Sequence, residues 1–439
     1  MDVSFWRSLS GLETGLFVAP FVLLLLSIAV LPLVAHHWWE KNWSKAVVAL
    51  VFGVPVAAYL LIRDWHKLLH AGVEYAAFIA LLASLYVITG GIHIKGPLRG
   101  TPIVNTLLMG IGAVLANLVG TTGASMLLIR PILQANESRP RKSHVIVFFI
   151  FIVSNCGGCL TPLGDPPLYL GFLQGVPFDW TLRLVGPWAF VVGGLLGIFY
   201  LIDRMQFGAS GAVAQATELA EPAKIRIEGA MNFLFLLGVI GVILVAGYCL
   251  HGQFGEMASK AFQIAAMSVL AVAAYRLTPV RIRQQNKFTF APIAEVAILF
   301  AGIFAAMIPT LEILHARGAE FGIERPWQFF WMTGALSAFL DNAPAYLTFT
   351  NLAKGVLGIQ AEGLAPLAAE GSGSTFLVAI SCGAVFMGAL SYIGNGPNFM
   401  VKAIAEEAGV RMPGFFTYIL WAIVILVPLL VLTTLIFIG

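Results

Sequence analysis

The chain has 439 residues, of which 59% are hydrophobic and 11% are charged, and its formal net charge is +3. Soluble globular proteins carry about 25% charged residues, so this composition excludes a soluble protein and predicts one surrounded by lipid. The long, non-alternating apolar runs favour membrane-spanning helices over a β-barrel, and the small net charge gives no indication of nucleic-acid binding.

The first half of the chain, residues 1–202, is predicted to contain four plain spans, one hairpin and one broken helix. The apolar stretch at about 102–134 is interrupted at Gly120–Gly123, and each part is too short to cross, which predicts a re-entrant hairpin. The stretch at about 144–176 is too long for one plain span, and Gly and Pro interrupt it between Asn155 and Pro167. The plain spans are expected at about 16–34, 44–62, 70–89 and 181–202.

A mixed-charge segment, 203–229, is the predicted cytoplasmic linker to the second half, 230–439. A second re-entrant hairpin is predicted at about 327–356, broken at Asp341–Pro344. A second discontinuous helix is predicted at about 374–409, broken at Gly394–Asn398. The plain spans of this half are expected at about 230–250, 258–276, 290–311 and 414–438.

The two halves are related in sequence. The block TPLGDPPLYL (Thr161–Leu170) matches SYIGNGPNFM (Ser391–Met400), and Glu74 with the alanines that follow it matches Glu295. Matched blocks in the same order indicate an internal repeat. The predicted fold is an all-α polytopic membrane protein made of two inverted repeats, each with five transmembrane spans, one of them a discontinuous helix, plus one re-entrant hairpin.

The distribution of Lys and Arg independently supports an inverted arrangement of the two repeats. These residues concentrate near 41–45, 95–99, 139–142 and 276–287, which marks one side of the membrane as cytoplasmic. Each repeat has an odd number of crossings, so the second repeat must insert upside down relative to the first. Inverted repeats with paired broken helices are typical of secondary transporters, whose sites lie near the middle of the bilayer.

Polar residues gather at the four predicted breaks, where unwound backbone must line a cavity or be buried in protein. Asp165 and Asp341 are the two carboxylates there, and both are candidates for ion binding. Each of them could instead only cap the half-helix that follows it. Hydroxyl and amide oxygens nearby could complete the shell of a hard cation such as sodium. The predicted ion or substrate ligands are Thr121, Thr122, Ser154, Asn155, Thr161, Asp165, Asp341, Asn342, Ser391, Asn395 and Asn398, with sodium itself expected at Asn155, Asp165, Asp341 and Asn395.

Three further charged residues each have two possible roles. Glu74 and Glu295 occupy matched positions near the start of their spans, where they could relay protons or sit as solvated charges at the interface. Arg130 ends the first hairpin near the cytoplasm. It could extend to the membrane surface or bind a substrate anion.

Four segments, LVGTTGASMLLIRP, FFIFIVSNCGGCLTPLGDPPLYLGF, LDNAPAYLTF and YIGNGPNFMVKAIAE, resemble the citrate-transporter and NhaD-type sodium:proton antiporter group of the ion transporter superfamily. The resemblance covers roughly residues 70–430. It implies a homodimer with a scaffold domain and a moving transport domain. It also implies sodium binding at Ser154-Asn155 and acidic functional positions at Asp165 and Asp341. One departure is that Val119–Thr122 lacks the acidic Asp-Asn of the NhaD-type first hairpin.

These observations predict a secondary active transporter of the bacterial inner membrane, not an enzyme, with sodium as its coupling or transported ion and no other cofactor. The first hypothesis is sodium/proton antiport by elevator-type alternating access. The second is sodium-coupled symport of a small carboxylate or oxyanion such as citrate. A remote third is an intramembrane aspartyl protease, since two membrane aspartates can share a proton. That hypothesis leaves the inverted repeat unexplained.

Overall fold

The computed structural model describes residues 3–96, 99–214, 226–369 and 371–439. Within this part of the chain, ten helices are long and apolar enough to cross a membrane, which confirms the predicted all-α polytopic fold. The longer helices of the first half are α2 (Gly11–Val34), α4 (Asn42–Arg63), α5 (Trp65–Thr89), α6 (Pro102–Ala135), α7 (Ser143–Ile152), α8 (Pro166–Leu173) and α9 (Val185–Ala214).

The second half follows the same order of elements as the first. Its longer helices are α10 (Asn232–Leu244), α11 (His251–Leu277), α13 (Ala291–Arg317), α14 (Pro326–Phe339), α15 (Asn342–Val356), α17 (Ser372–Met387), α18 (Gly396–Glu407) and α19 (Phe415–Thr433). Short helices are α1 (Val3–Ser8), α3 (His36–Trp39), α12 (Val280–Gln285) and α16 (Ala365–Ala368). Short 3₁₀ helices lie at Cys156–Cys159, Phe178–Leu184, Gly318–Phe321 and Gly388–Leu390, and π-helical turns lie at Val245–Leu250 and Thr434–Ile438.

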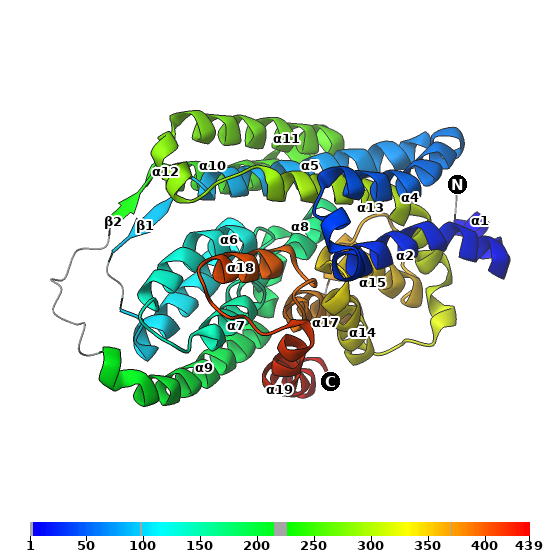
Figure 1. Cartoon of the computed structure of the whole chain (residues 1–439). Coiled ribbons are helices and arrows are strands. Elements are labelled where there is room, and N and C mark those ends of the chain that lie inside the picture. Colours follow the sequence, from blue (N-terminus) through cyan, green and yellow to red (C-terminus); the bar gives the residue numbers. More distant parts are fainter. Residues whose placement is uncertain (1–2, 97–98, 215–225, 370) are drawn as a thin grey trace.

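The helices form two layers (Figure 1). In the first layer α5 packs against α10, α11 and α13, and α13 also packs against α4, along the upper side of the view. In the second layer α6, α7 and α9 lie on the opposite side together with α14, α17 and α19. Helices from both halves contribute to each layer, as expected if the halves are inverted copies of one another.

Helix α6 is a hairpin, although its two parts are joined by a single non-helical residue. Gly120 has φ 77° and ψ 156°, a left-handed extended conformation that glycine adopts without a steric penalty. A straight helix would separate Asn105 from Asn136 by about 46 Å. Their side-chain amides instead form two hydrogen bonds with each other, 2.9 and 2.8 Å long. The chain therefore reverses at Gly120, and both ends of α6 lie on the same side.

Helices α14 and α15 form the second hairpin, with Leu340 and Asp341 at the turn. The rings of Phe329 and Phe349 are 6.2 Å apart between centroids, whereas a continuous helix would separate these residues by about 30 Å. The predicted break extended to Pro344, but α15 already begins at Asn342. Proline is tolerated in the first turn of a helix because its missing N–H has no partner there.

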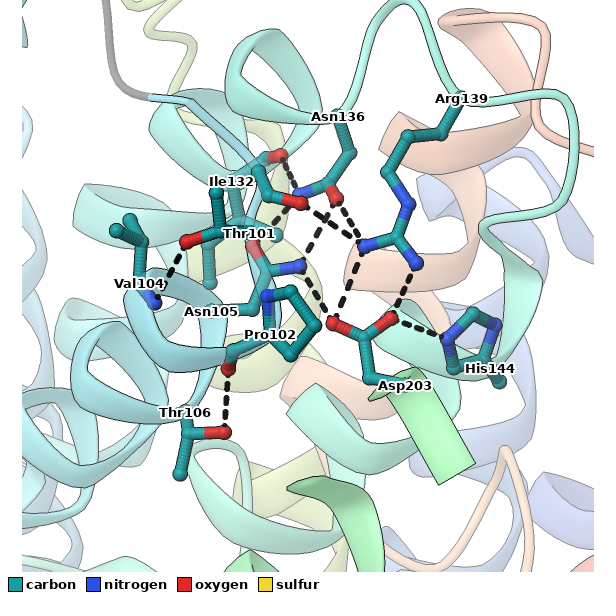
Figure 2. A network of polar contacts seen from close by, with 11 residues as sticks. Thr101, Pro102, Val104, Asn105, Thr106, Ile132, Asn136, Arg139, His144 and Asp203 are labelled. Carbon is teal, nitrogen blue, oxygen red and sulfur yellow. Dashed lines mark hydrogen bonds and ion pairs between the residues drawn. The ribbon is translucent and has the colours of Figure 1, made fainter. Parts of the chain in front are cut away.

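A buried polar cluster closes the base of the first hairpin (Figure 2). The Asp203 carboxylate on α9 is fully buried and accepts hydrogen bonds from Asn105, Arg139 and His144. Asn136 also accepts a hydrogen bond of 3.0 Å from Arg139. These contacts connect both ends of α6 to the start of α7 and the second half of α9, so the four segments are held as one unit.

Other boundaries differ from the prediction. Helix α9 continues to Ala214, into the predicted linker, of which 215–225 lies outside the described residues. After that gap, β2 (Arg226–Glu228) pairs antiparallel with β1 (His93–Lys95), a contact too short to leave a sequence pattern. The second broken helix resumes at Gly396, so its irregular part covers residues 388–395 and not the predicted Gly394–Asn398.

Candidate functional site

The Asp165 carboxylate lies at the point where the broken helices and both hairpins meet. It is 1% exposed. Thr121 at the turn of the first hairpin donates a hydrogen bond of 2.8 Å to Oδ1, and Asn395 of the second broken helix donates one of 3.2 Å to the same atom. Asn342 of the second hairpin donates to Oδ2. Four segments distant in the sequence therefore converge on one carboxylate.

Asp341 makes the capping contact with the helix that follows it, and Asp165 does not. Asp165 stands at the N-cap of α8, but its side chain makes no capping hydrogen bond. Its carboxylate is instead directed to the other three segments. Asp341 accepts a hydrogen bond of 3.1 Å from the backbone N–H of Ala343, so it caps α15. Its side chain is half-buried.

Asparagines extend this cluster toward the first broken helix. Asn155 Nδ2 donates to Asn398 Oδ1 over 2.6 Å. Asn395 Nδ2 lies 3.2 Å from Asn155 Oδ1 and 3.3 Å from the backbone oxygen of Ser154, as well as 3.2 Å from Asp165 Oδ1. An amide nitrogen has two hydrogens, so three acceptor oxygens surround a group that can satisfy only two.

Two of the predicted ligands hold the hairpins in place and do not join the cluster directly. The Thr161 hydroxyl donates to the backbone oxygen of Asn117 in the first hairpin. The Ser391 hydroxyl donates to the backbone oxygen of Ala338 in the second. Thr161 and Ser391 are matched in the two halves and make matching contacts. The Ser154 hydroxyl similarly pairs with Ser125 over 2.8 Å, so only its backbone oxygen faces Asn395.

Three predicted residues lie outside the cluster. Thr122 is half-buried and makes no hydrogen bond to the cluster within the described residues. Glu74 on α5 pairs with Lys260 on α11 at 3.2 Å, and Glu295 on α13 pairs with Lys45 on α4 at 2.8 Å. Each glutamate is thus bound to a lysine from the opposite half. These pairs connect helices of the first layer and favour a structural role over proton relay.

Asn117 is a contributor that sequence reasoning missed. It is 6% exposed and lies on α6 just before the turn. Its Oδ1 accepts the backbone N–H of Leu160 over 2.7 Å, and its Nδ2 donates to the backbone oxygens of Ala113 and Gly157. The sequence did contain a signal, which is an asparagine in an otherwise apolar half-helix. A buried amide must find hydrogen-bond partners.

We expect Asn117→Ala to lower the free energy of unfolding by about 1–3 kcal/mol, because the Leu160 N–H loses its acceptor and the first hairpin loses its contact with the broken helix. Thermal unfolding in detergent, followed by tryptophan fluorescence, measures this. Asn351→Ala is the matched control, since among the described residues the Asn351 side chain bonds only to Leu347 in its own helix. Equal effects of the two substitutions would contradict the role of Asn117.

The paired broken helices and hairpins around a buried cluster of oxygen atoms are the arrangement of membrane transporters, and the protein is a multi-pass membrane transporter. A family model described as "Putative citrate transport" matches residues 12–438, and the chain belongs to that family. Two relatives, each named an uncharacterized transporter, come from Mycobacterium bovis and Mycobacterium tuberculosis. Each is 23% identical over 396 residues, which cover 83% of this chain and 87% of the relative. The family and the relatives point to a transporter and not to an enzyme.

Proposed function

We propose that the protein is a sodium-coupled secondary transporter of the bacterial inner membrane and that it exchanges sodium for protons. The observation that carries this proposal is the state of Asp165. Its carboxylate is buried, its bonding partners Thr121, Asn342 and Asn395 are all neutral, and no Lys, Arg or His of the described residues forms an ion pair with it. A buried carboxylate without a partner charge is costly, and a bound cation or a proton removes that cost.

The oxygen atoms around Asp165 suit a hard cation. Asp165 Oδ1, Asn155 Oδ1 and the Ser154 backbone oxygen all lie within 3.3 Å of one amide nitrogen. Asn342 Oδ1 is buried and has no hydrogen-bond partner among the described residues, an unsatisfied acceptor that calls for an explanation such as an ion. Carboxylate, amide and backbone oxygens are the ligands that hard cations prefer. Sodium and protons would compete for this site.

The two layers supply the parts of the proposed movement. The layer of α4, α5, α10, α11 and α13 would be the static scaffold. The hairpins and broken helices would move against it as a unit, carrying the ion between the two sides of the membrane. The homodimer implied by the sequence resemblance would keep the two scaffolds fixed in the bilayer, and it is part of the same proposal.

Symport of a small carboxylate with sodium is the second candidate, and the description of the family favours it. In that case sodium at the Asp165 cluster would remain, and the organic anion would replace the proton as the second species. The two candidates differ in whether sodium flux moves protons in the absence of any carboxylate.

Proteoliposomes containing the purified protein and a trapped pH-sensitive dye test the proposal. We expect an outward sodium or lithium gradient to acidify the lumen without citrate, because each cation that leaves is exchanged for entering protons, and potassium to have no such effect. Absence of proton movement between pH 6 and 9, together with citrate uptake that depends on sodium, would contradict antiport and support symport. Absence of both would contradict the sodium proposal.

A further inference from the structure

A cavity of about 230 Å³ opens between the two layers, away from the Asp165 cluster. Its walls come from the second part of α6, from the end of α18, and from the segments that follow α5 and α12. It is smaller than the roughly 300–1,000 Å³ of drug-sized ligand pockets. Arg130, which lines it, follows Thr121 by nine residues on one helix, or roughly 14 Å along the axis. The cavity lies on the side that the distribution of Lys and Arg marks as cytoplasmic.

Two cations face this cavity from different layers. Arg130 projects from α6, and its guanidinium makes no hydrogen bond or ion pair with any described residue. Lys287 lies just after α12 on the opposite wall and pairs with Glu407 at the end of α18. Arg130 also acts electrostatically on the Glu407 carboxylate. Two cations and one carboxylate line the cavity, so its net charge is positive.

The backbone at Lys287 is fixed by its neighbours. Lys287 is the single non-glycine residue with positive φ, 46°, among the described residues, and such a conformation is maintained only where the surroundings impose it. Asn286 beside it donates to the backbone oxygens of Gly90 and Ile92 over 2.9 and 2.7 Å, and it accepts from His93. These contacts with the segment after α5 hold the backbone from which Lys287 projects.

We propose that this cavity binds a small di- or tricarboxylate whose carboxylate groups bridge Arg130 and Lys287. Arginine binds carboxylates through two parallel hydrogen bonds, and a lysine serves as a point charge. The Glu407 carboxylate shows that such a group fits beside Lys287. That pair is more than half exposed on both sides, so a ligand carboxylate displaces it at little cost. The bound anion links the two layers on the cytoplasmic side. The site does not depend on sodium coupling.

Isothermal titration of the purified full-length protein with citrate, at constant ionic strength and without sodium, tests this site. We expect saturable binding, at least about tenfold weaker binding in Arg130→Gln and in Lys287→Gln, and tighter binding in Glu407→Gln, because that substitution removes the competing carboxylate. Lys402→Gln, on the same helix α18 but paired with Glu406, is the matched control and should bind as the wild type does. Acetate, which has one carboxylate, should bind far more weakly.

Three outcomes would overturn the proposal. The first is that neither the wild type nor Glu407→Gln binds citrate. The second is that acetate binds as tightly as citrate, which would show that no pair of ligand carboxylates bridges Arg130 and Lys287. The third is that Asp165→Asn abolishes citrate binding while Arg130→Gln does not, which places the anion at the central cluster. Because binding is measured without sodium, failure of this site leaves the sodium proposal intact, and the reverse also holds.

Discussion

Asp165→Asn is expected to abolish sodium-dependent transport and the stabilisation of the purified protein by sodium. Loss of a buried charge partner costs about 3–5 kcal/mol, which corresponds to at least about a 100-fold loss of sodium affinity. The fold itself should survive, because an uncharged amide in this buried place is cheaper than an unpaired carboxylate. Thermal unfolding with and without sodium measures the effect, since a ligand that binds the folded state raises its stability.

The pH dependence of the wild type provides a second readout of the same site. Protons and sodium compete for the carboxylates of Asp165 and Asp341, so the sodium-induced stabilisation should shrink as pH falls and grow as pH rises. Asp179→Asn, at an exposed position after α8, is the control and should respond to sodium as the wild type does. A sodium response in Asp165→Asn equal to that of the wild type would show that the ion binds elsewhere.

Asp203→Asn is expected to be the most destabilising single change outside the cluster around Asp165. The carboxylate is fully buried and neutralises Arg139, which is itself 5% exposed, and it also accepts hydrogen bonds of 2.8 Å from His144 and 3.0 Å from Asn105 (Figure 2). Removing one member of a buried ion pair costs about 3–5 kcal/mol, because the other charge is left without compensation. For a chain of 439 residues, the midpoint of thermal unfolding should fall by about 3–5 °C.

The matched control is an acidic residue in an exposed ion pair. Glu406 pairs with Lys402 on the surface of α18 and is 45% exposed. Glu406→Gln should change the free energy of unfolding by less than about 1 kcal/mol, since exposed pairs contribute little. If Asp203→Asn unfolds at the temperature of the wild type, the cluster at the base of α6 does not hold the hairpin to α7 and α9.

The class of protein and the positions of the breaks could be predicted because both depend on local chemistry. So few charges cannot cover a soluble surface, and apolar runs of spanning length require helices in lipid. Gly120 and the prolines after Asp165 and Asn395 limit the backbone whatever the rest of the chain does. The exact ends of the helices were less predictable. The start of α2 at Gly11, for example, is stabilised by a capping box between Ser10 and Glu13 outside the apolar run.

The sequence predicted which residues would lie at the candidate site, but it did not predict the role of each one. Asp165 and Asp341 occupy similar local patterns, each before a half-helix that begins with proline in its first turn. Only the packing of distant segments shows that Asp341 caps its helix while Asp165 accepts hydrogen bonds from Thr121, Asn342 and Asn395. The same applies to Thr161 and Ser391, whose hydroxyls are occupied by the hairpins.

By itself the sequence determined that this protein spans a membrane, roughly where its two hairpins turn and its two discontinuous helices break, and which polar side chains lie at those breaks. The tertiary structure alone decided which of these side chains meet. It joined Asn155 to Asn398 and Lys287 to Glu407 across more than a hundred residues. The physical reason is that backbone limits act within a few residues, whereas the partner of a buried polar group depends on how distant helices pack.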